Sequence, residues 1–587
     1  MKKILNKLLD VSLLARILRL AKPFRLKLYA AYGLTILIAV GAVCNPLLTE
    51  HIINNYVMKP NLHMLTKFTA LLMTILVLQS LLTFSFTYLA WWLGQNIIQR
   101  LRVETFNHIQ HLNLRYFDRT PVGTSVTRTI NDIETINDIF TEGVIAIIAD
   151  LLTIIVVLSV MFYQSWKLTL VCLSVLPILL LGAYLFKEGI RKSFTEVRTQ
   201  VARLNAFLQE HISGMSVVQI FTAEEREFKK FKEINAAHRH ANIRSNFYYS
   251  VFFPLVEIIS ACAIGLLVWY GSENLLKTDG DLGMITAFIM FINLLFRPIR
   301  MLADKFNTLQ MGMVAADRVF KLLDNKDNMI NGGTLDAKKL KGEIEFRNVS
   351  FAYDEINSVL KNISFHIQAG ETIAIVGSTG SGKSSTINLI SRLYEFQQGE
   401  ILIDKENIRD YELYSLRKNI GVVLQDVFLF SGSVFDNITL RNREITLEQV
   451  IAAAKICGAH DFIMNLPDGY NYDVMERGAT LSMGQRQLIS FIRTLIYNPK
   501  ILVLDEATSS IDTESEMLIQ YAMEKLIDGR TSIIIAHRLS TIQKADKILV
   551  IEKGELKESG THEQLLSKGG YYRKLYDMQF ANRTEKV

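Results

Sequence analysis

Residues 377–384 have the types and spacing needed to hold a chain of phosphates. They read Gly-Ser-Thr-Gly-Ser-Gly-Lys-Ser and fit the pattern G-x-x-x-x-G-K-[ST]. Glycines at these positions let several backbone N–H groups point at one anion. Lys383 is expected to pair with the β- and γ-phosphates, and the Ser384 hydroxyl to bind Mg²⁺. The predicted ATP-binding residues of this loop are Gly377, Ser378, Thr379, Gly380, Ser381, Gly382, Lys383, Ser384 and Ser385.

Two adjacent carboxylates follow a short apolar run further along the chain. The residues Ile501-Leu-Val-Leu predict a buried strand whose end delivers Asp505 and Glu506. Asp505 would hold Mg²⁺, and Glu506 would orient or deprotonate an attacking water. Many strands end in acidic residues, so this pair is informative because the phosphate loop accompanies it. Together the two motifs predict an ATP hydrolase that uses ATP and Mg²⁺.

The elements that position these residues follow an α/β pattern. Strands and helices alternate from Gly342 onward, and the strand Thr372–Val376 directly precedes the phosphate loop. A helix is expected to follow from Ser384, with the positive end of its dipole toward the phosphates. This alternation predicts a largely parallel sheet covered by helices.

The first half of the chain has a different composition. Hydrophobic residues make up 50% of the 587 residues. They concentrate in six stretches, near residues 28–49, 66–93, 140–163, 166–186, 249–271 and 283–305. Each stretch is long enough to cross the roughly 30 Å hydrocarbon layer as a helix. The sequence therefore predicts an all-α, six-helix membrane domain fused to a soluble α/β P-loop ATPase domain.

Basic residues indicate how the spans are oriented. Lys and Arg are frequent in the N-terminal segment and in the two long spacers, residues 94–139 and 187–248, and sparse in the other spacers. The positive-inside rule then predicts a multi-pass protein of the cell membrane with both termini in the cytoplasm. Residues 4–20 are expected to form an amphipathic helix on the membrane surface.

A third motif narrows the class of ATPase. Residues 481–487 read Leu-Ser-Met-Gly-Gln-Arg-Gln and lie shortly before Asp505. They resemble the signature motif of ABC-transporter ATPases, usually L-S-G-G-Q. With the phosphate loop and the paired carboxylates in this order, the whole chain resembles an ABC exporter half-transporter of the type IV, or B-subfamily-like, arrangement. Among these it resembles the Mdl-type bacterial multidrug exporter pairs.

The resemblance implies roles for further residues. Tyr353 stands where the family has an aromatic residue that stacks on adenine, and Gln425 where it has a glutamine that senses Mg²⁺ and the membrane domain. His537 matches the switch histidine that contacts the γ-phosphate, and residues 509–512 resemble the loop that crosses between two ATPases. The implied catalytic residues are Glu506, His537 and Gln425, and the implied Mg²⁺ ligands are Ser384, Gln425 and Asp505.

The resemblance also implies a dimer. Two ATPases of this family face head to tail, so each ATP lies between one chain's phosphate loop and the other chain's signature loop. The residues implied to act on the partner's ATP are Ser482, Met483, Gly484 and Gln485. Met483 departs from the family's glycine, and a side chain there should crowd the approach of the backbone to phosphate. Either the change is tolerated variation, or the partner is a different half-transporter that lacks the catalytic glutamate which this chain keeps.

We expect four regions along the chain: an amphipathic elbow helix (1–25), a six-helix transmembrane domain with long cytoplasmic extensions (26–325), a linker (326–342) and an ABC nucleotide-binding domain (343–587). Residues 117–123 and 212–221 resemble the turns that couple an ATPase to membrane helices. Asp150, Glu257, Arg297 and Arg300 lie in or near the spans, where charges are costly. They either form interfacial or interhelical contacts, among them a pair of Glu257 with an arginine of the sixth span, or they contact the substrate.

These features predict ATP-driven export, or flipping, of amphipathic and hydrophobic small molecules across the membrane by a chain that is one subunit of a heterodimer. The alternative is a homodimeric lipid flippase of the same fold. The expected partners are a second half-transporter, the lipid bilayer and the amphipathic substrate. Nucleic acid is not expected, because a net charge of +6 is small for this length. Six spans argue against a soluble ABC ATPase of translation or DNA repair, and Glu506 with His537 argues against a channel-like ABC protein.

Overall fold

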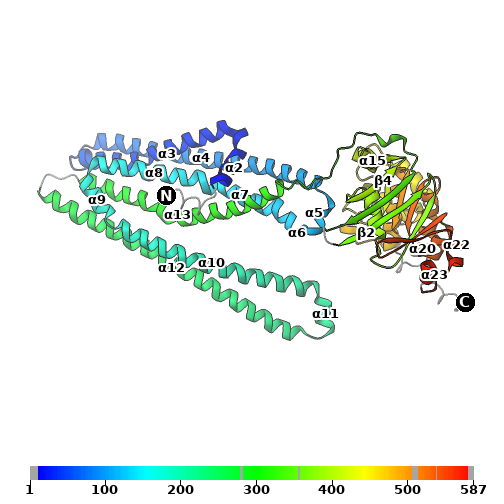
Figure 1. Ribbon diagram of the computed structural model, residues 1–587. Helices are drawn as coiled ribbons and strands as arrows, with labels where there is room; N and C mark the ends of the chain where they lie inside the picture. Colours follow the sequence, from blue (N-terminus) through cyan, green and yellow to red (C-terminus); the bar gives the residue numbers. More distant parts are fainter. Residues whose placement is uncertain (1–10, 278–281, 355–356, 506–512, 537, 579–587) are drawn as a thin grey trace. The chain divides into compact units, whose positions relative to one another are not determined.

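A computed structural model describes residues 11–277, 282–354, 357–505, 513–536 and 538–578 (Figure 1). The chain divides into two compact units. The first comprises residues 1–110 and 121–325, and the second comprises residues 111–120 and 326–587. The short segment 111–120 therefore belongs by its contacts to the second unit, although it lies within the helical half of the sequence.

The first unit is helical and contains six helical stretches that are long and apolar enough to cross a membrane. This confirms the predicted six spans. The long helices are α3 (Arg25–Ile52), α4 (Leu62–His111), α8 (Val144–Gln164), α10 (Leu176–Ser213), α12 (Glu224–Lys277) and α13 (Leu282–Leu323), with α9 (Trp166–Leu173) preceding α10. At 1.5 Å per residue the 50 residues of α4 extend about 75 Å, well beyond a hydrocarbon layer of about 30 Å. The helices therefore continue outside the bilayer.

The core of this unit is formed around α13, which packs against α3, α8 and α12. Its Phe288, Phe291 and Phe296 are buried almost completely. Helices α10 and α12 run side by side and meet at the short helix α11 (Met215–Ile220), as Figure 1 shows. The amphipathic helix α2 (Val11–Leu20) and the 3₁₀ turn η1 (Lys22–Phe24) precede α3.

Short helical segments connect the longer ones. They are the π-helical turns η2 (Ile53–Val57), η3 (Arg128–Asp132) and η4 (Ile139–Gly143), and the helices α6 (Val122–Thr127) and α7 (Ile133–Asp138). Helix α5 (Leu114–Arg119) belongs to the second unit.

The second unit is built on two sheets, which confirms the predicted α/β domain. The smaller sheet has the order β2-β1-β4-β5, with β1 (Ile344–Ala352), β2 (Ser358–Ile367), β4 (Gln398–Ile403) and β5 (Glu406–Asn407) antiparallel. The larger has the order β10-β9-β3-β8-β7-β6. Its strands are β3 (Thr372–Val376), β6 (Ile420–Val423), β7 (Ile501–Asp505), β8 (Thr531–Ile535), β9 (Lys547–Glu552) and β10 (Glu555–Gly560). All neighbours in it are parallel except β9 and β10.

The central strands of the large sheet bury both faces, which explains their continuous apolar runs. Alternate residues point to opposite faces of a strand. Ala374 and Val376 of β3 belong to a core shared with the helices, whereas Ile373 and Ile375 belong to a core shared with the smaller sheet.

The described helices of this unit are α14 (Lys383–Ile390), α15 (Leu413–Lys418), α16 (Val434–Thr439), α17 (Leu447–Ile456), α18 (His460–Met464), α19 (Met483–Ile496), α20 (Thr513–Ile527), α21 (Leu539–Lys544), α22 (His562–Lys568) and α23 (Tyr571–Tyr576). Short 3₁₀ turns complete the unit: η5 (Ala337–Lys339), η6 (Gly469–Asn471) and η7 (Glu476–Gly478).

Candidate nucleotide site

The predicted nucleotide motifs meet at the carboxyl edge of the large sheet. Strands β3, β8, β7 and β6 are parallel neighbours in that order. The phosphate loop follows β3, Asp505 ends β7, and Gln425 lies just after β6. Adjacent strands are about 4.8 Å apart, so β3 and β7 are separated by about 10 Å. Ligands of open α/β sheets bind at this kind of edge, outside the carboxyl ends of the strands.

The backbone of the phosphate loop is tightly enclosed by its neighbours. A Cβ atom at Gly377 would lie 2.0 Å from the carbonyl oxygen of Ile551 and 2.8 Å from Ser381 Oγ, so only glycine fits there. The Gly554 N–H donates to the Ser381 carbonyl (3.1 Å), and the Ser378 hydroxyl donates to Glu552 (2.9 Å). The end of β9 and the start of β10 therefore fix the shape of the loop.

Lys383 occupies the buried centre of this loop. Its side-chain Nζ donates to the carbonyl oxygens of Gly377 (2.9 Å) and Ser378 (3.0 Å). Burial lowers the pKa of Lys383 below its usual 10.5, and the negative charges of Asp505 and Glu552 act in the opposite direction. Lys383 as a whole is 8% exposed, and its amine touches no carboxylate in a described ion pair. A cation held in this way is suited to an anionic ligand.

Ser381 gives a direct test of whether the loop fits a phosphate. Its Oγ is buried, and among the described residues it has no hydrogen-bond partner. An unsatisfied buried hydroxyl costs about 1–3 kcal/mol. An oxygen of a bound phosphate would accept this hydrogen bond, and the loop therefore fits the phosphates of ATP.

The three predicted Mg²⁺ ligands lie around the same edge. Ser384 is exposed on the first turn of α14, Asp505 is partly exposed at the end of β7, and Gln425 is exposed after β6. Among the described residues no group of three or more His, Cys, Asp or Glu side chains could hold a metal by itself. Mg²⁺ is usually bound by one or two carboxylates together with substrate phosphates. This donor set fits a Mg²⁺ ion that arrives with its nucleotide.

Tyr353 is held beside α14. Its hydroxyl lies 3.0 Å from Ser385 Oγ and accepts a hydrogen bond from Asn388 (3.2 Å). Its ring contacts Phe351 and Tyr394 edge-on, with centroid separations of 4.8 and 4.9 Å. The Ser385 hydroxyl is thus engaged by Tyr353. The remaining predicted loop residues, Thr379, Gly380 and Gly382, lie in the loop itself.

The signature residues form the start of α19. The Ser482 hydroxyl accepts from the Gln485 N–H (3.2 Å), and the Gln485 side chain accepts from the Ser482 N–H (3.0 Å), which is a reciprocal helix cap. Met483 is the first helical residue and is 40% exposed, whereas Gly484 is buried. Methionine is compatible with this backbone, so any effect of Met483 must come from its exposed side chain.

Several predicted residues lie outside the described part of the chain. These are the proposed base Glu506, the proposed switch His537 and residues 509–512. The strands that lead to Glu506 and His537, β7 and β8, are neighbours at the centre of the sheet.

Sequence reasoning missed how the segment 111–120 is held by the nucleotide-binding unit. Asn113 caps α5, and its N–H donates to the Asp327 carbonyl (2.9 Å). The Tyr394 hydroxyl donates to Asp118, and Arg119 reaches the Tyr353 carbonyl (3.5 Å). Because Tyr394 also contacts the Tyr353 ring, α5 is connected to the predicted adenine site. No motif points to Tyr394, since its partners come from distant parts of the sequence.

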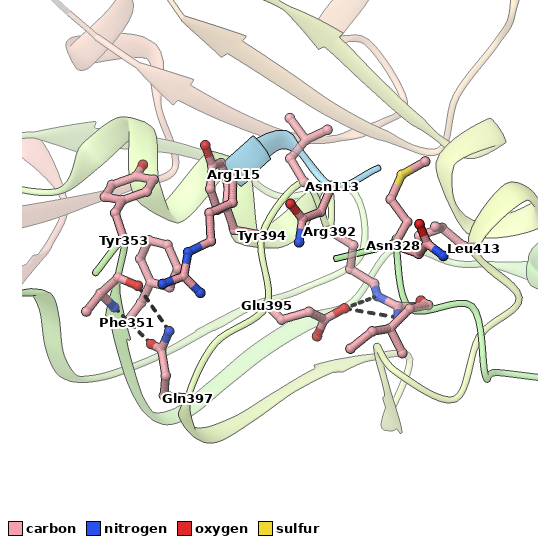
Figure 2. Close-up of a pocket in the computed structure, with 14 residues that line it drawn as sticks. Asn113, Arg115, Asn328, Phe351, Tyr353, Arg392, Tyr394, Glu395, Gln397 and Leu413 are labelled. Atoms are coloured by element: carbon pink, nitrogen blue, oxygen red, sulfur yellow. Dashed lines mark hydrogen bonds and ion pairs between the residues drawn. The ribbon is translucent and has the colours of Figure 1, made fainter. Parts of the chain in front are cut away.

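A small cavity of about 150 Å³ lies beneath this segment. Figure 2 shows the Arg115 side chain directed into it between Phe351 and Glu395. Buried Arg392 forms its opposite side, with an ion pair to Glu395 (3.1 Å) and a hydrogen bond to the Ile330 carbonyl (2.9 Å). Arg392 therefore connects α14 with the chain that enters the nucleotide-binding unit.

Within the helical unit, the structure provides a partner for one of the predicted span charges. Asp150 of α8 forms an ion pair with Lys305 of α13, and both side chains are largely buried. Glu257 and Arg297 are exposed on α12 and α13, and the side chain of Arg300 lies outside the described residues. The pairing of Glu257 with an arginine of the sixth span stays a prediction.

Known proteins resemble both units. Residues 28–299 match the family described as ABC transporter transmembrane region, and residues 360–509 match the family described as ABC transporter. A probable multidrug resistance ABC transporter ATP-binding/permease protein of Bacillus subtilis, YheH, is 40% identical over 84% of this chain and 73% of its own length.

Two further relatives match over nearly the full length. The ATP-dependent lipid A-core flippase of Syntrophus aciditrophicus is 35% identical over 97% of this chain and 95% of its own. A putative multidrug export ATP-binding/permease protein of Staphylococcus aureus is 38% identical over 97% of this chain and 100% of its own. With six spans joined to an ATP-binding α/β unit, the chain belongs to the ABC transporter family and is a multi-pass membrane protein that couples ATP hydrolysis to transport.

Proposed function

We propose that this chain is one subunit of a heterodimeric exporter that moves amphipathic or hydrophobic small molecules out of the cell. The observation that carries the proposal is the meeting of the phosphate loop, Asp505 and Gln425 at one sheet edge, in a chain that also holds six candidate spans. An ATPase fused to its own membrane domain can convert nucleotide-dependent motion into movement of the membrane helices of the same chain.

The residues of this chain have distinct proposed tasks. Lys383 neutralises the phosphates, and Ser381 donates a hydrogen bond to one of them. Tyr353 stacks on adenine, and the tyrosine is already oriented by its hydrogen bonds to Ser385 and Asn388. Glu506 accepts the proton of the attacking water, and His537 contacts the γ-phosphate. In this proposal Asp505 binds the metal and Glu506 acts on the water.

Mg²⁺ would be held by Ser384, Asp505 and Gln425 together with the phosphate oxygens. When bound, it would neutralise charge that develops on the transferred phosphate. The partly exposed positions of all three side chains leave their oxygens accessible for this role.

The partner is proposed to be a different chain. Ser482 and Gly484 are retained in the signature, but Met483 places an exposed side chain where the partner's γ-phosphate would approach. A heterodimer with one weak and one competent site accommodates this change, because this chain's own phosphate loop and Glu506 work with the partner's signature. The runner-up is a homodimer in which Met483 is tolerated.

A second surface supports an association between chains. The turn around α11 presents Val217, Ile220 and Phe221 with exposed fractions of 57%, 76% and 76%. Exposed apolar clusters on a cytoplasmic extension mark interaction sites. We assign this turn to the ATPase unit of the partner chain, which makes it the proposed coupling contact of residues 212–221.

The cargo is proposed from the relatives. One of those compared is described as a multidrug resistance transporter, one as a multidrug export protein and one as a lipid A-core flippase. These cargoes share an apolar body and a polar end, so an amphipathic molecule is the substrate class. The orientation with both termini in the cytoplasm follows the distribution of basic residues, and it places the ATPase where ATP is abundant.

The test compares the chain alone with the chain co-expressed with a half-transporter from a neighbouring gene. A heterodimer predicts a stable complex whose ATPase is stimulated by amphipathic compounds, and little activity from the single chain. The matched variant Met483→Gly separates the two alternatives. It should raise the activity of the single chain if Met483 alone prevents homodimeric turnover. Full cargo-stimulated activity of the unmodified single chain would instead establish the homodimer.

A further inference from the structure

A basic cavity lies between the N-terminal elbow and α4. Its volume is about 550 Å³, and its charged lining consists of Arg19, Lys22, Arg25, Arg100 and Glu104. Arg19 lies in the last turn of α2, Lys22 lies in η1, and Arg25 begins α3. Three consecutive elements therefore direct cations toward one space, and α4 contributes a fourth cation.

The α4 side of the cavity follows one helix face. Ile97, Arg100, Leu101 and Glu104 are spaced by three or four residues, so they lie on one side of the helix. Ile97 and Leu101 are buried at 2% exposure each, whereas Arg100 is exposed. The cavity thus has an apolar floor and a charged rim, as a molecule with an anionic head and an apolar body requires.

The four cations are not neutralised within the described part of the chain. None of them makes an ion pair with a described residue, and Glu104 is the one acidic residue of the lining. The neighbouring Arg16 is different, because it forms a two-fold ion pair with Asp324 at 2.6 and 2.7 Å. Positive charge therefore remains available in the cavity for an external anion.

The cavity lies at the level of a membrane interface. Trp92 of α4 contacts the Phe24 ring edge-on (5.7 Å), and the Lys27 ammonium lies 3.2 Å from the centroid of the Trp92 ring. Tryptophan favours the headgroup level of a bilayer. Ile97 and Arg100 lie five and eight residues further along α4, or about 8–12 Å along its axis. This depth corresponds to the headgroup layer and its aqueous edge.

We propose that this cavity binds the phosphate headgroup of an anionic phospholipid. Basic pockets beside membrane helices on the cytoplasmic side recognise such headgroups. The four cations hold the phosphate, and Ile97, which is nearer to Trp92 along α4 than Arg100 is, lies on the side of the glycerol and acyl chains. The assignment to the cytoplasmic leaflet rests on the proposed orientation of the termini, whereas the binding itself does not depend on the transported cargo.

The elbow is also linked to the last membrane helix, which gives occupancy a structural consequence. Arg16 lies on the same helix as Arg19, pairs with Asp324, and places its guanidinium 4.1 Å from the centroid of Phe320 on α13. A headgroup that holds α2 and α4 together should therefore also restrict the motion of the C-terminal end of α13.

The experiment measures lipid binding to the purified full chain, with its partner chain where the complex requires it. Native mass spectrometry compares phosphatidylglycerol with phosphatidylcholine of identical acyl chains, and inorganic phosphate is added as a competitor. The test variant is Arg19→Gln with Arg100→Gln. The control is Lys229→Gln with Lys232→Gln, which removes the same charge from exposed positions of α12.

Wild type and control should bind phosphatidylglycerol in preference to phosphatidylcholine, and the test variant should lose about tenfold to thirtyfold of that affinity. Thermal midpoints without added lipid verify that each variant is folded, and the single change Arg100→Gln replaces the double variant if that one is not. Equal binding of the two lipids, or equal losses in test and control variants, would overturn the proposal. Displacement of the lipid by millimolar phosphate would also overturn it, because the site would then serve a soluble anion. None of these outcomes bears on ATPase activity or export.

Discussion

Replacement of Lys383 by methionine separates the cost of burying this cation from its value in binding ATP. In the structure Lys383 is 8% exposed, and its ammonium donates two hydrogen bonds to carbonyls of its own loop. Hydrogen bonds from a charged donor stabilise by about 1.5–3 kcal/mol each. Removal of the ion from water costs several kcal/mol. These opposing contributions nearly cancel, so Lys383→Met should change the free energy of unfolding without nucleotide by no more than about 1 kcal/mol.

The effect on ATP binding should be much larger. Truncation of one partner of a buried charge pair costs about 2–5 kcal/mol, which lowers affinity by about 30-fold or more. A ligand at about 100 times its Kd stabilises a protein by about 2.7 kcal/mol. The same ATP concentration should then stabilise Lys383→Met by less than about 1 kcal/mol.

Thermal unfolding with and without ATP measures both effects. A change of 1 kcal/mol shifts the midpoint by about 2–4 °C in a domain of this size. The control is Lys455→Met, an exposed lysine of α17, which should keep the full ATP-dependent shift. The prediction would be wrong if the unfolding midpoint of Lys383→Met without ATP lay more than about 4 °C below that of the wild type. It would also be wrong if ATP raised the midpoint of Lys383→Met as much as that of the wild type.

The same pair of proteins should differ in pH dependence. The pKa of Lys383 is lowered by burial in the folded state, from 10.5. The unfolded chain therefore binds more protons in the alkaline range just below 10.5, and the wild type gains stability as pH rises through that range. Lys383→Met lacks this gain, so any stability advantage of the variant should shrink as the pH approaches 10.5.

Three further substitutions test separate contacts. Arg392→Met removes the buried donor that Glu395 and three carbonyls share, so we expect the free energy of unfolding to fall by about 3–5 kcal/mol, as measured by thermal unfolding. A fall of less than about 1 kcal/mol would contradict this prediction. Tyr394→Phe removes the hydrogen bond to Asp118 and should reduce cargo stimulation of the ATPase by about two- to tenfold while basal hydrolysis persists; an equal loss of both activities would indicate a structural role. Arg16→Gln should lower the free energy of unfolding by at most about 1 kcal/mol, because the ion pair between Arg16 and Asp324 is well exposed. A larger decrease, seen as a lower unfolding midpoint, would show that the contact of Arg16 with the Phe320 ring contributes most.

The parts that local sequence could predict are those with a local physical cause. Six apolar stretches predicted the spans because a bilayer demands about 20 apolar residues at each crossing. The loop at Gly377 predicted its strand and helix because the phosphate motif needs both. The apolar run before Asp505 predicted a buried strand for the same local reason.

Other features depend on contacts between distant residues and gave no local signal. The pairing of Asp150 with Lys305 joins α8 to α13, and residue 305 stood at the very end of the predicted span. The link from Tyr394 to Asp118 joins residues that are 276 positions apart in the sequence. The basic cavity forms because α2, η1 and α3 converge on α4. The periodicity of residues along a single helix cannot predict such a convergence.

ATP-dependent transport in proteoliposomes tests the central claim most directly. The complex that contains this chain is reconstituted, and accumulation of a fluorescent amphipathic dye is compared for wild type and Glu506→Gln, with nucleotide binding measured in parallel. We expect dye accumulation to require ATP and to be abolished by Glu506→Gln, although this variant still binds ATP. Accumulation that continues without ATP, or at a near-normal rate in Glu506→Gln, would contradict it.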